Sequence, residues 1–321
     1  MEETHRSGQK NCVVLVNPVS KQKRPKQLQV LLQEIDERAL DWSVVVAPPK
    51  GLTETARTLA AEGVRRLIIY GGDGSVNAMA HALAGSGVEL GILPSGTGND
   101  FARALGIPTD IRQALDILQS AVSRPVDLGQ CNGQYFINVA GIGFDAEVVS
   151  NARRFKRFAS SRKAAYFLSV FYTLLRMKSY RATIFFDGEN EGVERRLLLG
   201  AVGNGRYIGG GMCVAPKAEI DDGMLDVCLV KKIGRLHFLR LFPLFIRGDH
   251  IAHTDVVEYR RVRSIAIHFE QKLPLQMDGE LCSATKLEAS VVSGALRLLF
   301  PVAEEDASGG HSFPPKGGFA L

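Results

Sequence analysis

Two glycine-rich turns carry the residue types that hold a phosphate group. They span residues 70–77 and 94–100, and each follows a short apolar run and precedes helix-forming residues. Glycine lets the backbone turn sharply and come close to a ligand, while the unpaired N–H groups and the dipole of the following helix attract an anion. This pattern favours phosphate binding. The simpler alternative is a strand-to-helix corner in which glycine provides only the geometry.

Parallel strands would bring the two turns together. The apolar runs 67–69 and 90–93 each predict a short buried strand, and residues 76–83 predict the helix that follows the first turn. In α/β proteins ligands bind beyond the carboxyl ends of parallel strands, so turns about twenty residues apart can line one sheet edge. Neither turn has P-loop spacing, and the H-R-D loop of protein kinases is missing from the sequence. Both of those classes are disfavoured.

Two further turns carry closely spaced acids. Asp278-Gly279-Glu280 lies between apolar residues, which predicts a tight hairpin, and its carboxylates are also candidates for a general base. The acidic turn at residues 219–226 can likewise be a plain hairpin, although closely spaced carboxylate and carbonyl oxygens suit Mg²⁺. From the residues alone, a structural and a chemical role remain alternatives at both turns.

The two glycine-rich turns, taken together and in this order, resemble the catalytic domain of the diacylglycerol kinases. The resemblance rests on Gly71–Asn77 (GGDGSVN) and Pro94–Arg103 (PSGTGNDFAR), and it extends from Asn17 to about Pro301. It is closest to the soluble bacterial lipid kinases, which are themselves similar to sphingosine and ceramide kinases. The resemblance implies ATP- and Mg²⁺-dependent phosphoryl transfer to a lipid hydroxyl, with diacylglycerol as the leading acceptor and phosphatidic acid as the product.

The same resemblance implies a set of site residues. The general base would be Glu280 or Asp278, with no choice between them, and Asp73 would orient the catalytic magnesium unless it is only a helix N-cap acid. The expected nucleotide-binding residues are Asn17, Ser20, Gly71, Gly72, Asp73, Gly74, Ser75, Val76, Asn77, Gly96 and Thr97. A structural magnesium would be held by Glu219, Asp222 and the backbone carbonyl of Met224.

The sequence pattern changes after about residue 126. Strands and helices alternate through residues 1–126, which predicts an α/β nucleotide-binding domain of three layers with a mostly parallel sheet. Residues 127–294 contain short β-rich runs separated by turn residues, with one helix at 161–177, and they predict an antiparallel β-sandwich for the lipid substrate. Residues 295–302 are expected to return to the first domain, as the resemblance implies, and residues 303–321 to form a disordered tail.

The composition is that of a globular protein of the cytoplasm. Of the 321 residues, 45% are hydrophobic and 23% are charged, which excludes disordered and fibrous classes. The five cysteines show no C-x-x-C spacing, and the polar start argues against a secretory signal. We expect a cytoplasmic protein peripheral to the inner face of the membrane, with no nucleic-acid partner and with homodimerisation left open.

A basic segment supports the membrane expectation. Basic residues are concentrated in 153–163, just before the apolar stretch 164–175, and the formal net charge is +5. A basic amphipathic stretch of this kind can lie in a membrane interface, whereas the alternative is a solvated helix face beside a core helix. Peripheral membrane contact is therefore an expectation with one open alternative.

Two other function classes compete with a lipid kinase. NAD and sugar kinases share a Gly-Gly-Asp-Gly turn, but the loop at 94–100 and the basic segment favour a lipid acceptor. A catalytically silent lipid-binding protein could retain the same fold. The presence of Asp73, Asp278 and Glu280 argues against that reading.

Overall fold

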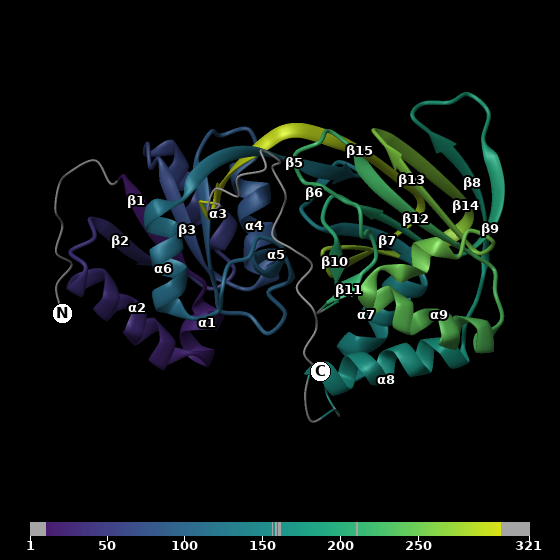
Figure 1. Cartoon of the computed structure of the whole chain (residues 1–321), viewed down its shortest axis with the longest axis horizontal. Helices are drawn as coiled ribbons and strands as arrows, with labels where there is room; N and C mark the ends of the chain where they lie inside the picture. Colours follow the sequence, from purple (N-terminus) through teal and green to yellow (C-terminus); the bar gives the residue numbers. More distant parts are fainter. Residues whose placement is uncertain (1–10, 156, 158, 160–161, 210, 303–321) are drawn as a thin grey trace, which may run out of the picture. The chain divides into compact units, whose positions relative to one another are not determined.

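The computed structural model of the chain describes residues 11–302 except residues 156, 158, 160, 161 and 210. The predicted tail, residues 303–321, and part of the predicted basic segment lie outside the described residues. The described chain forms two compact units (Figure 1). One runs up to Val126 and takes in the residues from Ala295 on, and the other is Asp127–Gly294.

The first unit is built on parallel strands in the order β2-β1-β3-β4-β15, and each neighbouring pair runs parallel. The strands are β1 (Cys12–Val16), β2 (Trp42–Val46), β3 (Arg66–Gly71), β4 (Glu89–Pro94) and the last part of β15 (Glu280–Phe300). Strands β1, β3 and β4 are buried almost throughout, as expected for strands covered on both faces.

Helices cover both faces of this sheet. The connection from β1 to β2 runs along the sheet in one direction, and the connections from β2 to β3 and from β3 to β4 run in the other. Because such crossovers are right-handed, α2 lies on one face of the sheet, and α3 and α4 lie on the opposite face. Helix α6 packs against α2, and α3 against α4. The helices are α1 (Pro18–Lys23), α2 (Pro25–Glu37), α3 (Leu52–Ala61), α4 (Asp73–Leu83), α5 (Asp100–Ala104) and α6 (Ile111–Ser120).

The second unit is antiparallel, so parallel pairing is limited to the first. Its main order is β13-β12-β9-β7-β14-β15, with β8 bonded to β9 and β14 and with β5 bonded to β6 and β15. The strands are β5 (Val122–Cys131), β6 (Gln134–Phe136), β7 (Val139–Gly143), β8 (Tyr180–Phe186), β9 (Val193–Gly203), β12 (Leu225–Lys231), β13 (Val257–Val262) and β14 (Ser264–Met277). A separate pair consists of β10 (Tyr207–Ile208) and β11 (Met212–Cys213).

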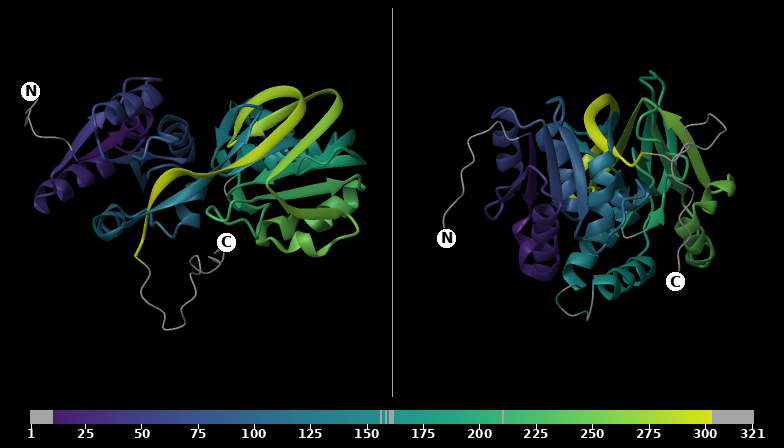
Figure 2. Two further views of the ribbon diagram at one scale, coloured as in Figure 1. Left: turned by 90° about the horizontal axis from the view of Figure 1, so that it is seen from above. Right: turned by 60° about the vertical axis from the view of Figure 1, so that its left-hand side comes forward.

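The antiparallel strands expected from the sequence form one curled sheet. Val262 at one end of the order and Leu287 at the other belong to the same buried cluster, so the sheet folds over its own core and packs like a sandwich. The register shifts between His268 and Leu273, and again at the end of β12, which bends the long strands. Their curvature is visible in Figure 2.

Three helices cover the outer face of this curled sheet: α7 (Phe144–Phe155), α8 (Arg162–Leu175) and α9 (Arg235–Arg247), followed by a short 3-10 helix η1 (Asp249–Ala252). The sequence predicted only the helix corresponding to α8. Helix α9 contains Pro243, which weakens its helical pattern, yet Phe238, Leu241 and Phe245 all face the core. No helix in the described ranges is long and apolar enough to cross a membrane.

Candidate active site

Three turns meet at one edge of the first unit's sheet. They follow β1, β3 and β4, which are neighbours in the sheet, so their carboxyl ends lie side by side. Backbone bonds join them: the Asn17 N–H donates to the Tyr70 carbonyl at 3.1 Å, and the Ser95 N–H donates to the Gly71 carbonyl at 2.8 Å. The two glycine-rich turns predicted to act together are therefore held together at the strand ends.

Gly72 and Gly96 allow these turns to touch through their backbones. A Cβ on Gly72 would lie 2.8 Å from the Gly96 Cα, and a Cβ on Gly96 would lie 2.7 Å from the Gly72 Cα. Gly71 is similarly confined, because a Cβ there would meet the Ser75 side chain at 2.3 Å. Close approach of backbone to backbone, which only glycine permits, is the structural reason for these residues.

The N-terminus of α4 provides the anion-binding element. The helix begins at Asp73, three residues earlier than the sequence pattern predicted, and Gly72 at its N-cap supplies no capping side chain. Gly74 in the first turn is exposed, and a Cβ there would meet nothing within 4 Å. The Ser75 N–H already donates to the Gly72 carbonyl at 2.8 Å. The open space at Gly74 leaves room at the start of the helix, where N–H groups and the helix dipole favour phosphate oxygens.

Two polar side chains that are predicted to contact a nucleotide also cross-link the turns. Asn17 donates through Nδ2 to Ser75 Oγ at 2.7 Å, and its Oδ1 accepts the Val19 N–H at 2.8 Å. Ser20 is buried and accepts a 2.8 Å bond from Ser95 Oγ. These residues brace the site, so any contact with a nucleotide would have to come from their remaining hydrogen-bonding capacity.

The other predicted nucleotide ligands differ in exposure. Thr97 is exposed at the tip of its loop, and Asn77 is buried with its Oδ1 lacking a partner among the described residues. Val76 is buried, so only its backbone could serve a ligand. Asp73 is half-buried and accepts the Phe101 N–H at 3.2 Å, which ties the start of α4 to the start of α5.

Two arginines next to the second loop were not predicted. Arg24 donates to the Gly96 carbonyl at 2.9 Å, and Arg103 donates to the Gly98 carbonyl at 2.6 Å. Asn99, with φ of 53°, closes the loop by accepting the Gly96 N–H at 2.9 Å. Arg103 is also ion-paired with Asp100 at 3.2 Å, and the two guanidinium groups place positive charge beside this loop. The sequence signal was present in the Asn-Asp-Phe-Ala-Arg run, but Arg24 lies far from it along the chain.

In the acidic hairpin of the second unit, Asp278 and Glu280 have different surroundings. Asp278 and Gly279 have φ values of 47° and 84°, as a two-residue type I′ turn requires, and Met277 pairs with Glu280 across it. The Asp278 carboxylate accepts three backbone N–H groups, from Ile137 at 2.7 Å and from Asn138 and Val139 at 3.0 Å each. Asp278 therefore clamps the turn onto the segment that enters β7.

Glu280 has the freedom that Asp278 lacks. Its side chain is exposed, and no hydrogen-bond or ion-pair partner holds it within the described parts of the chain. The two candidate bases, which the sequence could not separate, are thus one carboxylate fixed by three donors and one carboxylate that is open to a ligand.

Two buried side chains, Gln276 and Asp145, form a hydrogen-bonded relay that supports the same hairpin. The Gly279 N–H donates to Gln276 Oε1 at 2.9 Å, and Gln276 Nε2 donates to Asp145 Oδ2 at 3.2 Å. Gly141 makes room for this acid, because a Cβ there would lie 1.7 Å from Asp145 Oδ2. Burial raises the pKa of Asp145 to about 6. The sequence did not single out either Gln276 or Asp145.

Asp145 also lines a small apolar cavity beneath α8 and α9. Its Oδ1 has no partner in the described part of the chain, and the other lining residues are mostly apolar or aromatic. The cavity measures about 30 Å³, close to the liquid volume of one water molecule.

Arg153, from the predicted basic segment, contacts the acidic hairpin. Its Nη2 donates to the Gly279 carbonyl at 2.8 Å, so this arginine supports the turn that carries the candidate base. Removing its charge would disturb that turn as well as any membrane contact. Arg154 and Arg157 are exposed, whereas Lys156 lies outside the described residues.

The predicted structural metal site lies in the turn before β12. Asp222 forms an ion pair with Arg261, and its Oδ1 accepts the Met224 N–H at 2.9 Å, while Glu219 is exposed. Nearby, Asp226 is buried and its Oδ2 has no hydrogen-bond partner among the described residues. Burial raises the pKa of Asp226, and the charges of Asp222 and Glu219 raise it further.

Carboxylate oxygens are the ligands that a hard divalent cation prefers, and Asp222 and Glu219 lie near enough to Asp226 for their charges to raise its pKa. Arg261 supplies one compensating positive charge to the same group. No cluster of three or more close metal-ligating side chains was found in the described part of the chain, so a carbonyl would have to complete the set.

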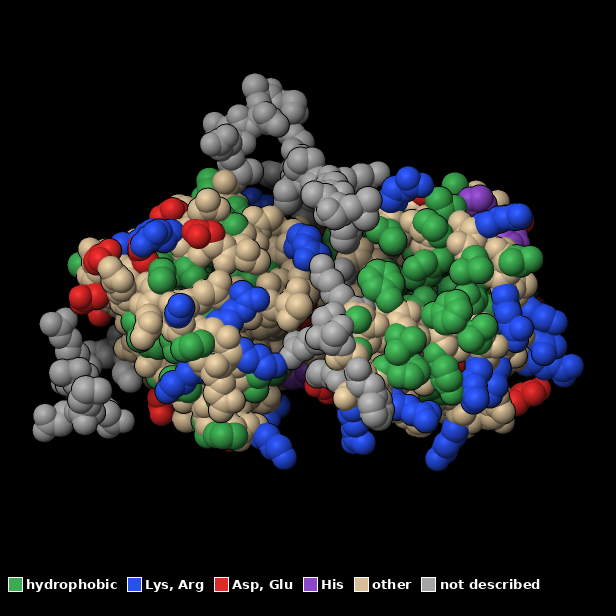
Figure 3. Space-filling model, turned by 90° about the horizontal axis from the view of Figure 1, so that it is seen from below, with side chains coloured by type: hydrophobic (Ala, Val, Ile, Leu, Met, Phe, Trp, Pro, Cys, Tyr) green, Lys and Arg blue, Asp and Glu red, His purple; other side chains and the backbone are tan. Residues whose placement is uncertain are grey.

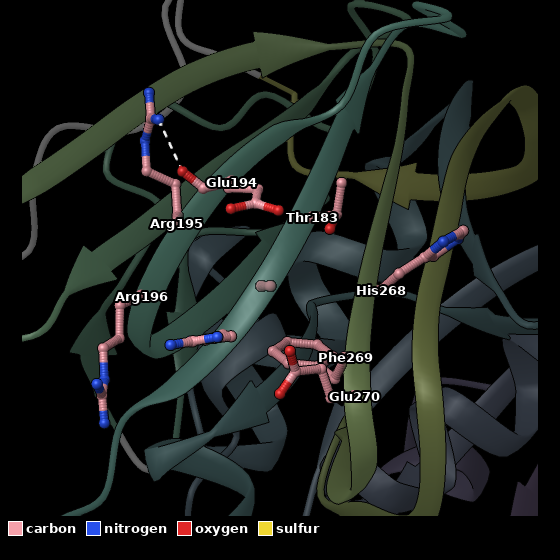
Figure 4. Close-up of a pocket in the computed structure, with 9 residues that line it drawn as sticks. Thr183, Glu194, Arg195, Arg196, His268, Phe269 and Glu270 are labelled. Carbon is pink, nitrogen blue, oxygen red and sulfur yellow. Dashed lines mark hydrogen bonds between the residues drawn. The ribbon is translucent and has the colours of Figure 1, made fainter.

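A surface hollow of the second unit lies away from these residues. It has a volume of about 590 Å³, and Figure 4 shows it lined by charged side chains of both signs from β8, β9 and β14, including Glu194, Arg195 and Glu270. None of the predicted site residues lines it. Its mixed charge and open form do not suit an apolar acceptor.

Comparison with protein families covers nearly all of the described chain. Residues 11–131 match the diacylglycerol kinase catalytic domain, and residues 138–300 match the YegS C-terminal NAD kinase beta sandwich-like domain. Among curated relatives, the chain is 33% identical to the diacylglycerol kinase of Bacillus subtilis (strain 168) over 276 residues, which cover 84% of this chain and 90% of that protein.

Two further comparisons agree. The chain is 36% identical over 253 residues to a YegS-like protein of Chromohalobacter salexigens named as a probable lipid kinase, with 77% of this chain and 79% of that protein covered. A crystal structure of a diacylglycerol kinase from Bacillus anthracis str. Sterne shares the fold, with a TM-score of 0.65 at 24% identity over 91% of this chain and 97% of that one. The chain therefore belongs to the family of diacylglycerol kinases and YegS-like lipid kinases.

Proposed function

We propose that this kinase transfers the γ-phosphoryl group of ATP to a lipid hydroxyl, with diacylglycerol as the acceptor and phosphatidic acid as the product. The observation that carries the proposal is the α4 N-terminus, where exposed Gly74 leaves open space and two arginines hold the neighbouring glycine-rich loop. The names of the curated relatives support the acceptor class. NAD kinase activity is the rival outcome, because the second unit resembles the sandwich of that class.

The residues of the first unit would bind and orient the nucleotide. Backbone N–H groups at the start of α4 would hold phosphate oxygens, and Arg24 and Arg103 would add positive charge beside them. Mg²⁺, when bound, neutralises phosphate charge and aligns the transferred group. Asp73 is the carboxylate of this turn, so we assign to it the orientation of that metal, while its bond to the Phe101 N–H holds it in position.

Glu280 is proposed as the general base and Asp278 as the residue that positions it. The acceptor hydroxyl would lose its proton to the Glu280 carboxylate as its oxygen forms a bond to the γ-phosphorus. The bond between that phosphorus and the bridging oxygen breaks, and ADP leaves with the electron pair. The choice of Glu280 follows from its exposure and from the three N–H donors that already occupy Asp278.

Glu219, Asp222 and the Met224 carbonyl are proposed to hold a second, structural Mg²⁺, which would brace the turn before β12. Free thiols at all five cysteines support a reducing, cytoplasmic setting. A lipid acceptor would then be met at the inner face of the membrane, where this kinase would act as a peripheral protein.

The test is transfer of radiolabelled phosphate from ATP to a panel of diacylglycerol, sphingosine, ceramide, phosphatidylglycerol and soluble NAD. We expect labelled phosphatidic acid from diacylglycerol and a requirement for Mg²⁺. Phosphorylation of NAD alone would establish the rival. No transfer to any lipid at any Mg²⁺ concentration would refute the proposal.

Two single variants separate the roles of the two acids. Glu280→Gln should lower kcat about 10²–10⁴-fold, the usual contribution of a general base, with unchanged thermal stability. Asp278→Asn replaces one acceptor oxygen by an amide group that donates, and this group would face backbone N–H donors. The variant should therefore lose activity and, in addition, about 1–3 kcal/mol of unfolding free energy. Equal losses of activity with no difference in stability would contradict this division.

A further inference from the structure

Exposed apolar side chains are concentrated on the outer faces of α8 and α9. Of the eleven large apolar side chains that are exposed in the described part of the chain, six lie on these two helices. They are Phe167 (60% exposed), Leu168 (45%), Phe171 (58%) and Leu175 (54%) on α8, and Leu236 (75%) and Leu239 (49%) on α9. Such a concentration requires an explanation that single exposed residues do not.

The spacing places these residues on one face of each helix. Phe167, Phe171 and Leu175 follow one another every four residues along α8, and Leu236 and Leu239 are three residues apart on α9. The inner faces, with Val170 and Phe238 among others, already pack into the unit's core. The outer apolar residues therefore leave much of their side-chain surface exposed to solvent.

The two helices form one surface. Tyr166 and Val170 of α8 and Phe238 and Phe242 of α9 line the same small cavity, so the helices are neighbours across it. Figure 3 shows the apolar side chains as a patch over this part of the second unit. We name the six exposed residues on α8 and α9 the apolar face.

Positive charge surrounds the apolar face. Neither helix contains an aspartate or a glutamate. Exposed basic residues lie on the helices or beside their ends, namely Arg154, Arg157, Arg176, Lys178, Arg235, Arg240 and Arg247. In Figure 3 blue basic groups border the green patch, with few red acidic groups near it. The surface thus combines an apolar centre with a basic rim.

We propose that this face docks on an anionic phospholipid bilayer, with the apolar side chains inserted among the acyl chains and the basic rim on the headgroups. The proposal rests on the proposed function, which requires a lipid acceptor. Amphipathic helices with basic flanks bind interfaces through apolar area and attraction to anionic lipid. A second copy of the chain fits less well, because a symmetric contact would bring the two basic rims together.

The test is sedimentation of the full-length protein with vesicles of phosphatidylcholine mixed with phosphatidylglycerol, compared with vesicles of phosphatidylcholine alone. The parent should bind the anionic vesicles more tightly, and added NaCl should weaken that binding. The triple variant Phe167→Ser/Phe171→Ser/Leu236→Ser should bind about 1,000-fold more weakly, at roughly tenfold for each large side chain withheld from the hydrocarbon. The control is Leu32→Ser on α2, an exposed apolar side chain of the first unit, which should bind like the parent.

A second pair of variants tests the rim. Arg235→Gln/Arg240→Gln should weaken binding to anionic vesicles about 25-fold, since each arginine near the surface contributes about fivefold. Binding to phosphatidylcholine should be unchanged. Arg57→Gln/Arg65→Gln, which removes two exposed charges of the first unit, is the control. Equal losses in both pairs would mean that net charge, not this face, attracts the membrane, and would overturn the proposal.

Further outcomes distinguish this proposal from its rivals. Unchanged vesicle binding by the triple variant would overturn it, as would a parent dimer that the triple variant converts to a monomer. Transfer to diacylglycerol dispersed in detergent should be retained by the triple variant, because docking is then unnecessary. A parent that binds vesicles through this face but phosphorylates no lipid would refute the proposed function and leave the docking face standing.

Discussion

The Gln276 side chain donates a hydrogen bond to the Asp145 carboxylate at 3.2 Å inside the second unit. The same amide group accepts the Gly279 N–H, so it connects Asp145 to the hairpin that carries Asp278 and Glu280. The side chains of Gln276 and Asp145 are both buried. The hairpin that carries Glu280 is thus held from beneath by a two-residue relay and from the side by Asp278. The position of an exposed carboxylate depends on side chains that solvent does not reach.

The relay predicts a loss of turnover without a loss of affinity. Gln276→Met keeps the side-chain size but removes the hydrogen bonds to Gly279, Asp145 and Val139, so the turn should shift. We expect kcat to fall by roughly 10²-fold, as about 1 Å of misplacement can cause, with KM within a few-fold of the parent. Asp145→Asn can still accept from Gln276 and should keep most of the activity. Steady-state kinetics on both variants provide the measurement, and an Asp145→Asn enzyme as slow as Gln276→Met would argue against the relay.

The contact between Gly72 and Gly96 predicts a sharp difference among glycines. Gly96→Ala would force a methyl group to within 2.7 Å of the Gly72 Cα, so it should cost about 1–3 kcal/mol of unfolding free energy and abolish the thermal shift caused by ADP. Gly74→Ala is the matched control, because its methyl group would meet open space and the protein should unfold at the same temperature or higher. Equal destabilisation by the two changes would contradict the packing of the turns.

The acidic turn before β12 predicts a metal-dependent stability. After treatment with a chelator, Mg²⁺ should raise the unfolding temperature of the parent because the metal binds only the folded turn. Asp222→Asn should abolish most of that increase, whereas Asp116→Asn, an exposed acid of the first unit, should leave it intact. Differential scanning fluorimetry across Mg²⁺ concentrations gives the comparison, and an increase of the same size in all three proteins would show that the ion acts elsewhere.

Two buried groups predict opposing effects of acid on stability. Burial lowers the pKa of His250 to about 4. Between pH 6.5 and 4, this histidine is therefore protonated in the unfolded chain but neutral in the folded chain. The unfolding free energy falls by up to about 3 kcal/mol as the pH decreases through this range. Burial raises the pKa of Asp145 to about 6, so between pH 6 and the unfolded value near 3.8 the folded chain holds the extra proton and becomes more stable as pH falls.

Urea unfolding across this pH range resolves the two contributions. Asp145→Asn should make the protein lose stability more steeply below pH 6, since only the histidine contribution then remains. His250→Gln should reverse the slope, and the variant should gain stability as the pH falls from 6 to 4. Parallel profiles for the parent and both variants would show that neither group titrates as its burial implies.

Several features followed from the sequence because their causes are local. The glycines at 71–74 and 96–98 permit the sharp turns, and the apolar runs before them form β3 and β4. The Asp278-Gly279 pair forms the two-residue hairpin that its residue types predict. The family resemblance is confirmed by the matches over residues 11–131 and 138–300. In each case a few consecutive residues carry the relevant backbone preference.

The difference between the two acids of the hairpin was decided only by the tertiary structure. The three N–H groups that occupy Asp278 come from residues about 140 positions earlier in the chain, and no local pattern connects them. Likewise, Asn17 and Ser20 bond to the neighbouring turns because adjacent strands end at the same edge of the sheet. Sequence periodicity reports which residues prefer to be buried or to turn, whereas the hydrogen-bond partner of a side chain depends on segments that only folding brings within reach.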